Sequence, residues 1–111
     1  MSNPYFGNVD LEHAMKSVGP GWHHIIRRLY QNKPDGVIVQ QVKEKFGTLS
    51  FYTGPAPEEY HQMIREAENE SAKICETCGN PGTLTSIRGW MRTICPLCRK
   101  ALDKKWAEEG R

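Results

Sequence analysis

The sequence lacks the features that mark membrane and secreted proteins. It has no apolar run near the roughly 20 residues needed to cross a bilayer. Its first ten residues, MSNPYFGNVD, lack the basic and then apolar pattern of a secretory signal. We therefore expect a cytoplasmic protein with no membrane partner. Because cytosolic thiols are kept reduced, we do not expect its cysteines to form disulfides.

The chain also lacks a strong excess of charge of either sign. Its 111 residues carry a formal net charge of +2, divided into −2 over residues 1–70 and +4 over residues 71–111. A domain that follows phosphate backbones is usually strongly basic. The charge alone therefore does not favour nucleic acid as the partner, although nucleic acid stays an alternative.

Histidines are few, and their positions argue against the zinc enzymes that use Cys-x-x-Cys motifs. All of them precede the first cysteine: His13, His23, His24 and His61. Zinc deaminases also need a His-x-Glu motif, and none of these histidines has Glu two residues later. Nucleases with a treble-clef zinc site need histidines in the hairpin and the helix after it. We therefore expect no enzyme activity, no catalytic residues and no small-molecule substrate.

The four cysteines form two Cys-x-x-Cys pairs separated by 16 residues. A two-residue gap lets one tight turn direct two sulfurs at one ion, and zinc prefers four thiolates in a tetrahedron. Gly79, next to the first pair, allows the backbone of such a turn. We predict one structural Zn²⁺ with no coordination position left for water, bound by Cys75, Cys78, Cys95 and Cys98. A redox role for the pairs is the less favoured alternative.

Periodicity before the cysteines predicts two short helices, a hairpin and a long helix. Apolar residues at helical spacing indicate helices over residues 11–18 and 22–29. Residues 37–42 and 48–52 are rich in β-branched and aromatic side chains, which favours a β-hairpin. Pro57 and the glutamates after it begin a helix that extends to residue 74.

The cysteine segment itself predicts a second hairpin and a final helix. Residues 83–87 and 90–94 flank the turn Arg88-Gly89, and residues 99–107 are helical in composition. A cysteine turn, a hairpin and a second cysteine pair that opens a helix resemble the treble-clef zinc finger. A zinc ribbon, with the second pair in a loop, is the alternative. The fold class predicted is α+β.

We expect one domain over residues 1–111. Residues 1–56 form a helix-helix-hairpin subregion, and residues 57–111 form a helix plus the zinc module. No long linker separates them, so we expect the two parts to share a core.

Tryptophan and arginine in the cysteine segment are the candidates for partner contact, because both residue types often anchor interfaces. The set is Arg88, Trp90, Arg92, Lys104 and Trp106. For Trp90 we favour the competing interpretation, in which it packs under its hairpin against the helix of residues 58–74. If the first hairpin lies beside the zinc module, Lys43 and Lys45 extend the basic residues of the module into one face.

Four motifs together resemble a group of small bacterial and prophage-encoded zinc-binding proteins that have four cysteines and no assigned activity. The motifs are GW at residues 21–22, QVKEKFGTLSFY at 41–52, CETCGNPG at 75–82 and GWMRTICPLC at 89–98. The resemblance covers about residues 20–100 and implies a phage or mobile-element setting with a structural zinc. By analogy, a host or phage protein is the expected partner, and inhibition of a bacterial defence complex, as by anti-CRISPR proteins, is one specific form. A small DNA- or RNA-binding regulator that uses the basic zinc module is the alternative.

Overall fold

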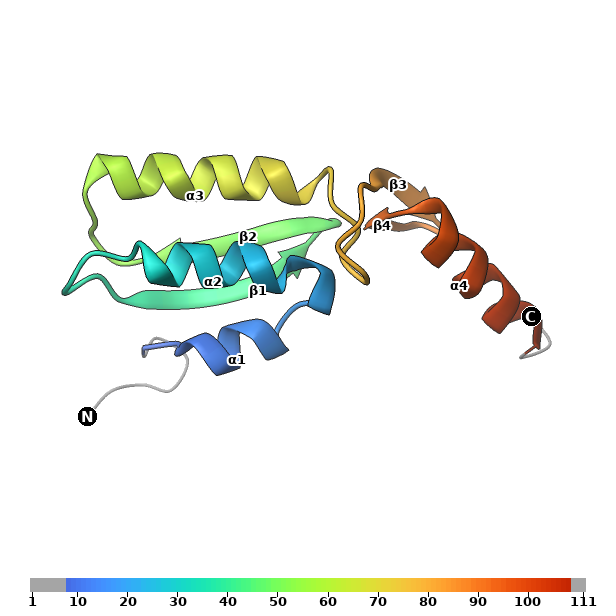
Figure 1. The fold of residues 1–111 in the computed structure, drawn as a ribbon, viewed down its shortest axis with the longest axis horizontal. Helices are drawn as coiled ribbons and strands as arrows, with labels where there is room; N and C mark the ends of the chain where they lie inside the picture. The colour runs from blue at the N-terminus through green and yellow to red at the C-terminus, as the bar shows by residue number, and fades with distance from the viewer. Residues whose placement is uncertain (1–7, 109–111) are drawn as a thin grey trace.

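The computed structural model describes residues 8–108 and has an α+β fold of helices and two small antiparallel sheets (Figure 1). The elements in chain order are α1 (Leu11–Lys16), the 3-10 helix η1 (Pro20–Trp22), α2 (His23–Gln31), β1 (Val39–Lys45), β2 (Thr48–Thr53), α3 (Glu58–Ser71), β3 (Thr83–Ile87), β4 (Trp90–Ile94) and α4 (Pro96–Glu108). The predicted fold class and the order of elements are confirmed.

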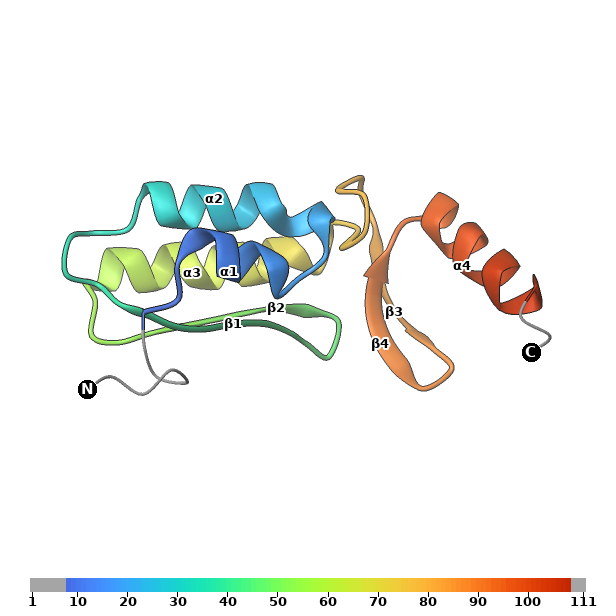
Figure 2. The same cartoon turned by 90° about the horizontal axis from the view of Figure 1, so that it is seen from below.

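The first hairpin and the helices before and after it form the larger body of the molecule. β1 and β2 pair antiparallel, from Val39 opposite Thr53 to Lys45 opposite Thr48. Figure 2 shows α2 and α3 on one side of this sheet. The apolar stripes of both helices therefore face the same buried layer as the inner side chains of the hairpin.

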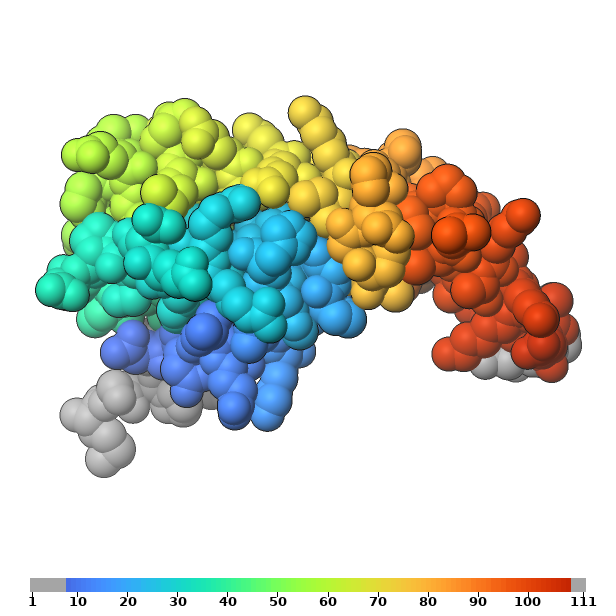
Figure 3. All heavy atoms as spheres, in the orientation of Figure 1, coloured from blue at the N-terminus to red at the C-terminus, as the bar shows by residue number. Residues whose placement is uncertain are grey.

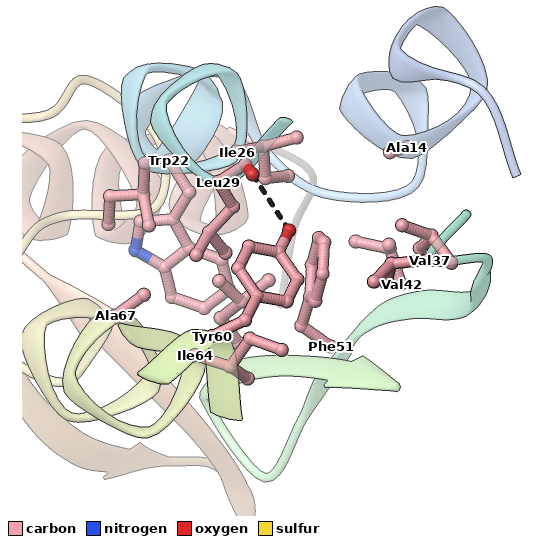
Figure 4. Close-up of a cluster of buried hydrophobic side chains, with 13 residues drawn as sticks. Ala14, Trp22, Ile26, Leu29, Val37, Val42, Phe51, Tyr60, Ile64 and Ala67 are labelled. Carbon is pink, nitrogen blue, oxygen red and sulfur yellow. Dashed lines mark hydrogen bonds between the residues drawn. The ribbon is translucent and has the colours of Figure 1, made fainter. Parts of the chain in front are cut away.

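The core of this body is shielded from solvent, and the tyrosine hydroxyl buried in it has a hydrogen-bond partner. Trp22, Ile26 and Leu29 are completely buried. Tyr60 places its ring in the same cluster and donates its hydroxyl to the carbonyl oxygen of Leu29 at 2.7 Å, as Figure 4 shows. A buried tyrosine normally needs such a partner, so α3 is attached to α2 by a hydrogen bond as well as by packing.

The buried side chains form two hydrophobic clusters, whereas a shared core was expected. The larger cluster joins α1 to α3, and the smaller one contains Cys75, Ile87, Ile94 and Cys95 with α4 packed against it. Helix α3 belongs to the larger cluster, and the boundary between the two clusters falls between Ile74 and Cys75. Figure 3 shows the C-terminal module projecting from one end of the larger body.

A backbone hydrogen bond joins the larger body to the cysteine turn: the Gly21 N–H donates to the carbonyl oxygen of Glu76 at 2.9 Å. Within the larger cluster, the Trp22 indole N–H donates to the carbonyl oxygen of Ile74, the residue before the first cysteine, at 2.9 Å. Gly21 approaches the cysteine turn so closely that a Cβ added to it would lie 1.9 Å from the Cys75 carbonyl oxygen. The GW motif is therefore the contact by which the larger body holds the first cysteine pair.

The helices of residues 8–108 include none that has both the length and the apolar composition needed to span a membrane.

Gly21→Ala tests the close approach. Because the added methyl group would meet backbone atoms, which cannot swing aside, we expect the free energy of unfolding to fall by about 2 kcal/mol or more. Gly54→Ala is the matched control: its Cβ would lie 3.7 Å from the nearest atom, so stability should change by less than about 1 kcal/mol. Urea unfolding at constant excess zinc measures both. Equal stability of the two variants would contradict the packing described.

Candidate metal centre

The four cysteine sulfurs come together at the base of the C-terminal module. The Sγ atoms of Cys75, Cys78, Cys95 and Cys98 all lie within 4.8 Å of one another. The Sγ atoms of Cys78 and Cys95 are 3.5 Å apart, whereas a disulfide needs about 2.05 Å. A tetrahedral Zn²⁺ with bonds of about 2.3 Å separates its sulfurs by about 3.8 Å. The donor set and its spacing therefore fit a metal ion of the zinc type.

A tight turn positions the first pair. The Gly79 N–H donates to the carbonyl oxygen of Cys75 at 2.9 Å, and Gly79 adopts a φ of +87° that side chains disfavour. The Cys75 N–H donates to the carbonyl oxygen of Asn80 at 2.7 Å. Cys75 is fully buried and Cys78 is exposed, so the turn presents one sulfur from inside and one from the surface.

Helix α4 positions the second pair. Cys95 directly precedes Pro96, which opens the helix, and Cys98 lies in the first turn. Pro is well placed there because the first helical N–H has no partner within the helix. The Cys98 N–H donates to Cys95 Sγ at 3.4 Å, and the positive end of the helix dipole favours thiolate. The second pair thus opens a helix, as the treble-clef alternative requires and the ribbon alternative does not.

The sulfurs influence one another's ionisation. Burial raises the pKa of the Cys75 thiol, but backbone N–H groups of Cys95, Cys78 and Thr77 outweigh it and leave the pKa at about 6. Burial and the neighbouring sulfurs raise the pKa of Cys98 above its usual range. Four thiolates this close repel one another until a cation joins them, and a divalent metal ion supplies that charge.

Backbone groups of the cysteine turn also bond to the second hairpin. The Glu76 N–H donates to the carbonyl oxygen of Thr93 at 3.0 Å, while its carbonyl oxygen accepts from Gly21. Burial raises the pKa of the half-buried Glu76 carboxyl, and Arg92 opposes this. Its Oε1 has no hydrogen-bond partner among the residues that the structure describes. The backbone of Glu76 therefore makes the connection between the GW motif and β4.

The expected burial of Trp90 is wrong: its side chain is 76% exposed. It pairs with Ile87 across the second hairpin, so both side chains project from the face that packs on α4. Ile87 is buried in the smaller cluster, whereas Trp90 is not part of it. Helix α3 lies in the other hydrophobic cluster and does not reach Trp90.

The other predicted contact residues lie on the same module but are not all together. The Arg88 guanidinium stacks 4.0 Å from the centre of the Trp106 ring, which itself packs on the smaller cluster. Arg92 lines a groove of about 210 Å³ between β4 and α4. Lys104 is exposed and lies two positions from Trp106, on the opposite side of the helix.

The first hairpin lies beside the C-terminal module. The predicted basic face, made of lysines of the first hairpin and basic residues of this module, requires that arrangement. Thr93 donates its buried hydroxyl to the carbonyl oxygen of Gly47, at the tip of the β1–β2 hairpin, at 2.7 Å. The basic face itself stays a prediction. Phe46, which is 75% exposed at this tip, was not among the predicted contact residues. The sequence feature that could have drawn attention to Phe46 is the pair Phe-Gly at a two-residue turn, where Asn-Gly is the usual pair.

Comparison of the chain with models of protein families, with curated proteins and with solved structures found no match.

Chelation of the metal should unfold the C-terminal module and leave the larger body folded. The smaller cluster has only a few buried side chains of its own, and two of them are candidate ligands, Cys75 and Cys95. With a strong chelator and reductant, we expect amide hydrogens of β3, β4 and α4 to exchange with solvent at least about a hundredfold faster. Those of α2 and α3 should keep most of their protection. Unchanged exchange in β4 and α4 would contradict a structural role for the ion.

Proposed function

We propose that this chain is a non-enzymatic binding protein in which one structural Zn²⁺ holds the C-terminal module in shape for a macromolecular partner. The four cysteines would bind the ion with sulfur alone. A catalytic zinc keeps one position for water or substrate, and a complete set of four thiolates occupies every position of a tetrahedral ion. The role we assign to the ion is therefore stabilisation of the module.

The exposure of Trp90 is the observation that carries this proposal. Tryptophan is costly to leave in water, because covering its large apolar surface lowers the free energy. At 76% exposure on the tip of a short hairpin, Trp90 contributes little to the stability of the module. Arg88 lies in the turn of the same hairpin and stacks on Trp106 of α4. The contact surface therefore has the residue types that most often anchor interfaces.

A protein partner fits this surface better than nucleic acid. Four thiolates and one Zn²⁺ lower the charge of residues 71–111 from +4 to about +2. Arg88 is engaged by Trp106, and Arg99 pairs with Asp103 at 3.3 Å, so neither guanidinium is fully available to phosphate. The DNA- or RNA-binding regulator therefore stays the second candidate.

The resemblance to phage and prophage proteins directs the proposal to a host or phage protein as the partner. A small protein of this kind acts by occupying a surface of its target. Inhibition of a bacterial defence complex is one specific form of that action, and it rests on analogy alone.

Trp90→Ala tests the contact surface. The side chain makes few internal contacts, so we expect the variant to keep its zinc and its melting temperature. Affinity for the protein partner, first captured from host-cell lysate by the wild-type chain and then purified, should fall at least about tenfold. Leu97→Ala is the matched control, because Leu97 is 73% exposed in the same module. An equal effect of the two substitutions would remove Trp90 from the contact.

A salt titration separates the two candidate partners. Binding to mixed-sequence DNA or RNA that neutralises several phosphates weakens steeply as salt rises, with a slope of about −0.9 per phosphate on double-stranded DNA. We expect weak binding to nucleic acid and a shallow slope. Tight binding with a steep slope that charge reversal at Arg92 reduces would favour the regulator instead.

A further inference from the structure

The two hairpins have four outer edges, and the edge of β2 is occupied by side chains of α3. The Leu49 N–H donates to Ser71 Oγ at 2.8 Å. The Phe51 N–H donates to Glu68 Oε2 at 2.9 Å. These two donors point away from β1, so another strand would have to displace α3 in order to pair there.

The outer edge of β1 is protected by other means. The Val39 carbonyl oxygen accepts the Val9 N–H at 2.8 Å, and the register of the strand shifts between Val39 and Gln41. The strand ends in three charged residues, Lys43-Glu44-Lys45. Bulges and charged side chains are common means by which proteins keep an edge strand from pairing with other chains.

The outer edge of β4 faces the rest of the molecule. The Glu76 N–H donates to the carbonyl oxygen of Thr93 at 3.0 Å, so the cysteine turn occupies part of this edge. The tip of the first hairpin lies against the same strand, because a Cβ added to Gly47 would lie 2.8 Å from the Arg92 nitrogen. Three of the four edges are therefore occupied or protected.

The outer edge of β3 is open within the part of the chain that the structure describes. Leu84 is opposite Thr93, whose carbonyl oxygen points away from β3 toward Glu76. In an antiparallel pair of that kind, both residues direct their backbone groups away from each other. The N–H and C=O groups of Leu84, and of Ser86 two positions later, therefore point outward. No hydrogen bond from residues outside the hairpin reaches them within residues 8–108.

The composition of β3 suits an edge that pairs with another strand. Its five residues, TLTSI, include no charge and no proline, and three of them are β-branched. Thr83, Leu84 and Ser86 are all exposed. An uncharged, exposed edge strand without proline lacks the usual protection against pairing. The β3 edge, defined here by the outward backbone groups of Leu84 and Ser86, therefore offers two donors and two acceptors to an extended segment.

The side chains beside the β3 edge favour apolar residues in that segment. Leu84 and Ser86 share one face of the hairpin with Met91, which is opposite Ser86. Leu84 and Met91 are each 37% exposed. A strand added to β3 places one side chain beside Leu84 and one beside Ser86, each about 5 Å away. Because serine is small, a large apolar side chain beside it also covers Met91, which lowers the free energy.

We propose that the β3 edge binds an extended segment of the target protein, which joins β3 and β4 as a third strand. The segment carries apolar side chains at the two alternate positions beside Leu84 and Ser86. In this mode of recognition, backbone hydrogen bonds supply affinity and the alternate side chains supply specificity. The inference rests on the proposed function as a binding protein. Trp90 is opposite Ile87 at the end of β3, so one target can contact the edge and the tryptophan.

Amide hydrogen exchange tests whether the edge is open before any partner binds. In the free full-length chain with its metal, we expect the amides of Leu84 and Ser86 to exchange at least about a hundredfold faster than those of Thr85 and Ile87, which face β4. Equal protection at all four positions would show that the edge is already covered and would overturn the proposal. Protection of Leu84 and Ser86 that grows with protein concentration would identify a second copy as the occupant, and would also overturn it.

Ser86→Pro tests the edge in binding. Proline removes an outward N–H and leaves the bonds between β3 and β4 in place, because other residues make them. Affinity for the target protein purified for the Trp90→Ala measurement should fall at least about tenfold. Ser86→Ala is the matched control, since it keeps the N–H, and it should bind within about twofold of the wild type. Equal affinity of the two variants would contradict strand addition.

Exchange in the complex decides the outcome if proline unfolds the hairpin. In the wild-type chain, binding of the same target should slow exchange at Leu84 and Ser86 at least about tenfold. Unchanged exchange there, with Trp90→Ala still weakening binding, would remove the β3 edge and leave the proposed function in place. If the wild-type chain captures no protein at all, the proposed function fails and the strand addition fails with it.

Discussion

The turn from Cys75 to Gly79 connects the larger body to the C-terminal module. Its sulfurs face the second cysteine pair, its carbonyl groups accept hydrogen bonds from Gly21 and Gly79, and Glu76 donates to β4. Short hydrogen bonds have direction, which apolar packing between two small clusters does not supply. A metal ion that fixed this turn would therefore also fix the position of the C-terminal module relative to the larger body.

This connection explains why two sequence motifs distant from each other serve one site. Gly21 and Trp22 lie more than fifty residues before the first cysteine. Gly21 approaches the cysteine turn at distances that only a residue without a side chain permits, and the Trp22 indole N–H donates to the carbonyl oxygen of Ile74, just before that turn. The first hairpin makes a second contact with the same module, through the carbonyl oxygen of Gly47 and the hydroxyl of Thr93 on β4. The module is thus held at two points, and partner surfaces on it are held with it.

Local pattern was sufficient to predict the elements and the clustering of the four cysteines. The helices, both hairpins and the cysteine cluster follow from apolar periodicity, turn residues and Cys-x-x-Cys spacing, all of which act over a few residues. The boundaries differ slightly: α3 ends at Ser71 and not at residue 74, because the chain there turns toward the cysteines. Between the two predicted helices, Pro20 begins the 3-10 helix η1, since proline suits the first position of a helix.

Long-range packing could not be predicted in the same way. A shared core was expected because no linker was visible, but hydrogen bonds at glycines can join two clusters without a linker. Trp90 was expected to pack under its hairpin against the helix of residues 58–74, but that helix belongs to the other cluster and Trp90 is 76% exposed. The positive φ of Phe46 and its 75% exposure depend on the turn that the first hairpin adopts, which the sequence did not reveal.

The central claim is that four sulfurs hold one zinc ion and that no other ligand is bound to it. X-ray absorption at the zinc edge, on full-length protein purified under reducing conditions, tests it most directly. The account predicts one zinc per chain with four sulfur neighbours at about 2.3 Å. A substoichiometric metal content, or an oxygen or nitrogen neighbour in place of one sulfur, would contradict it.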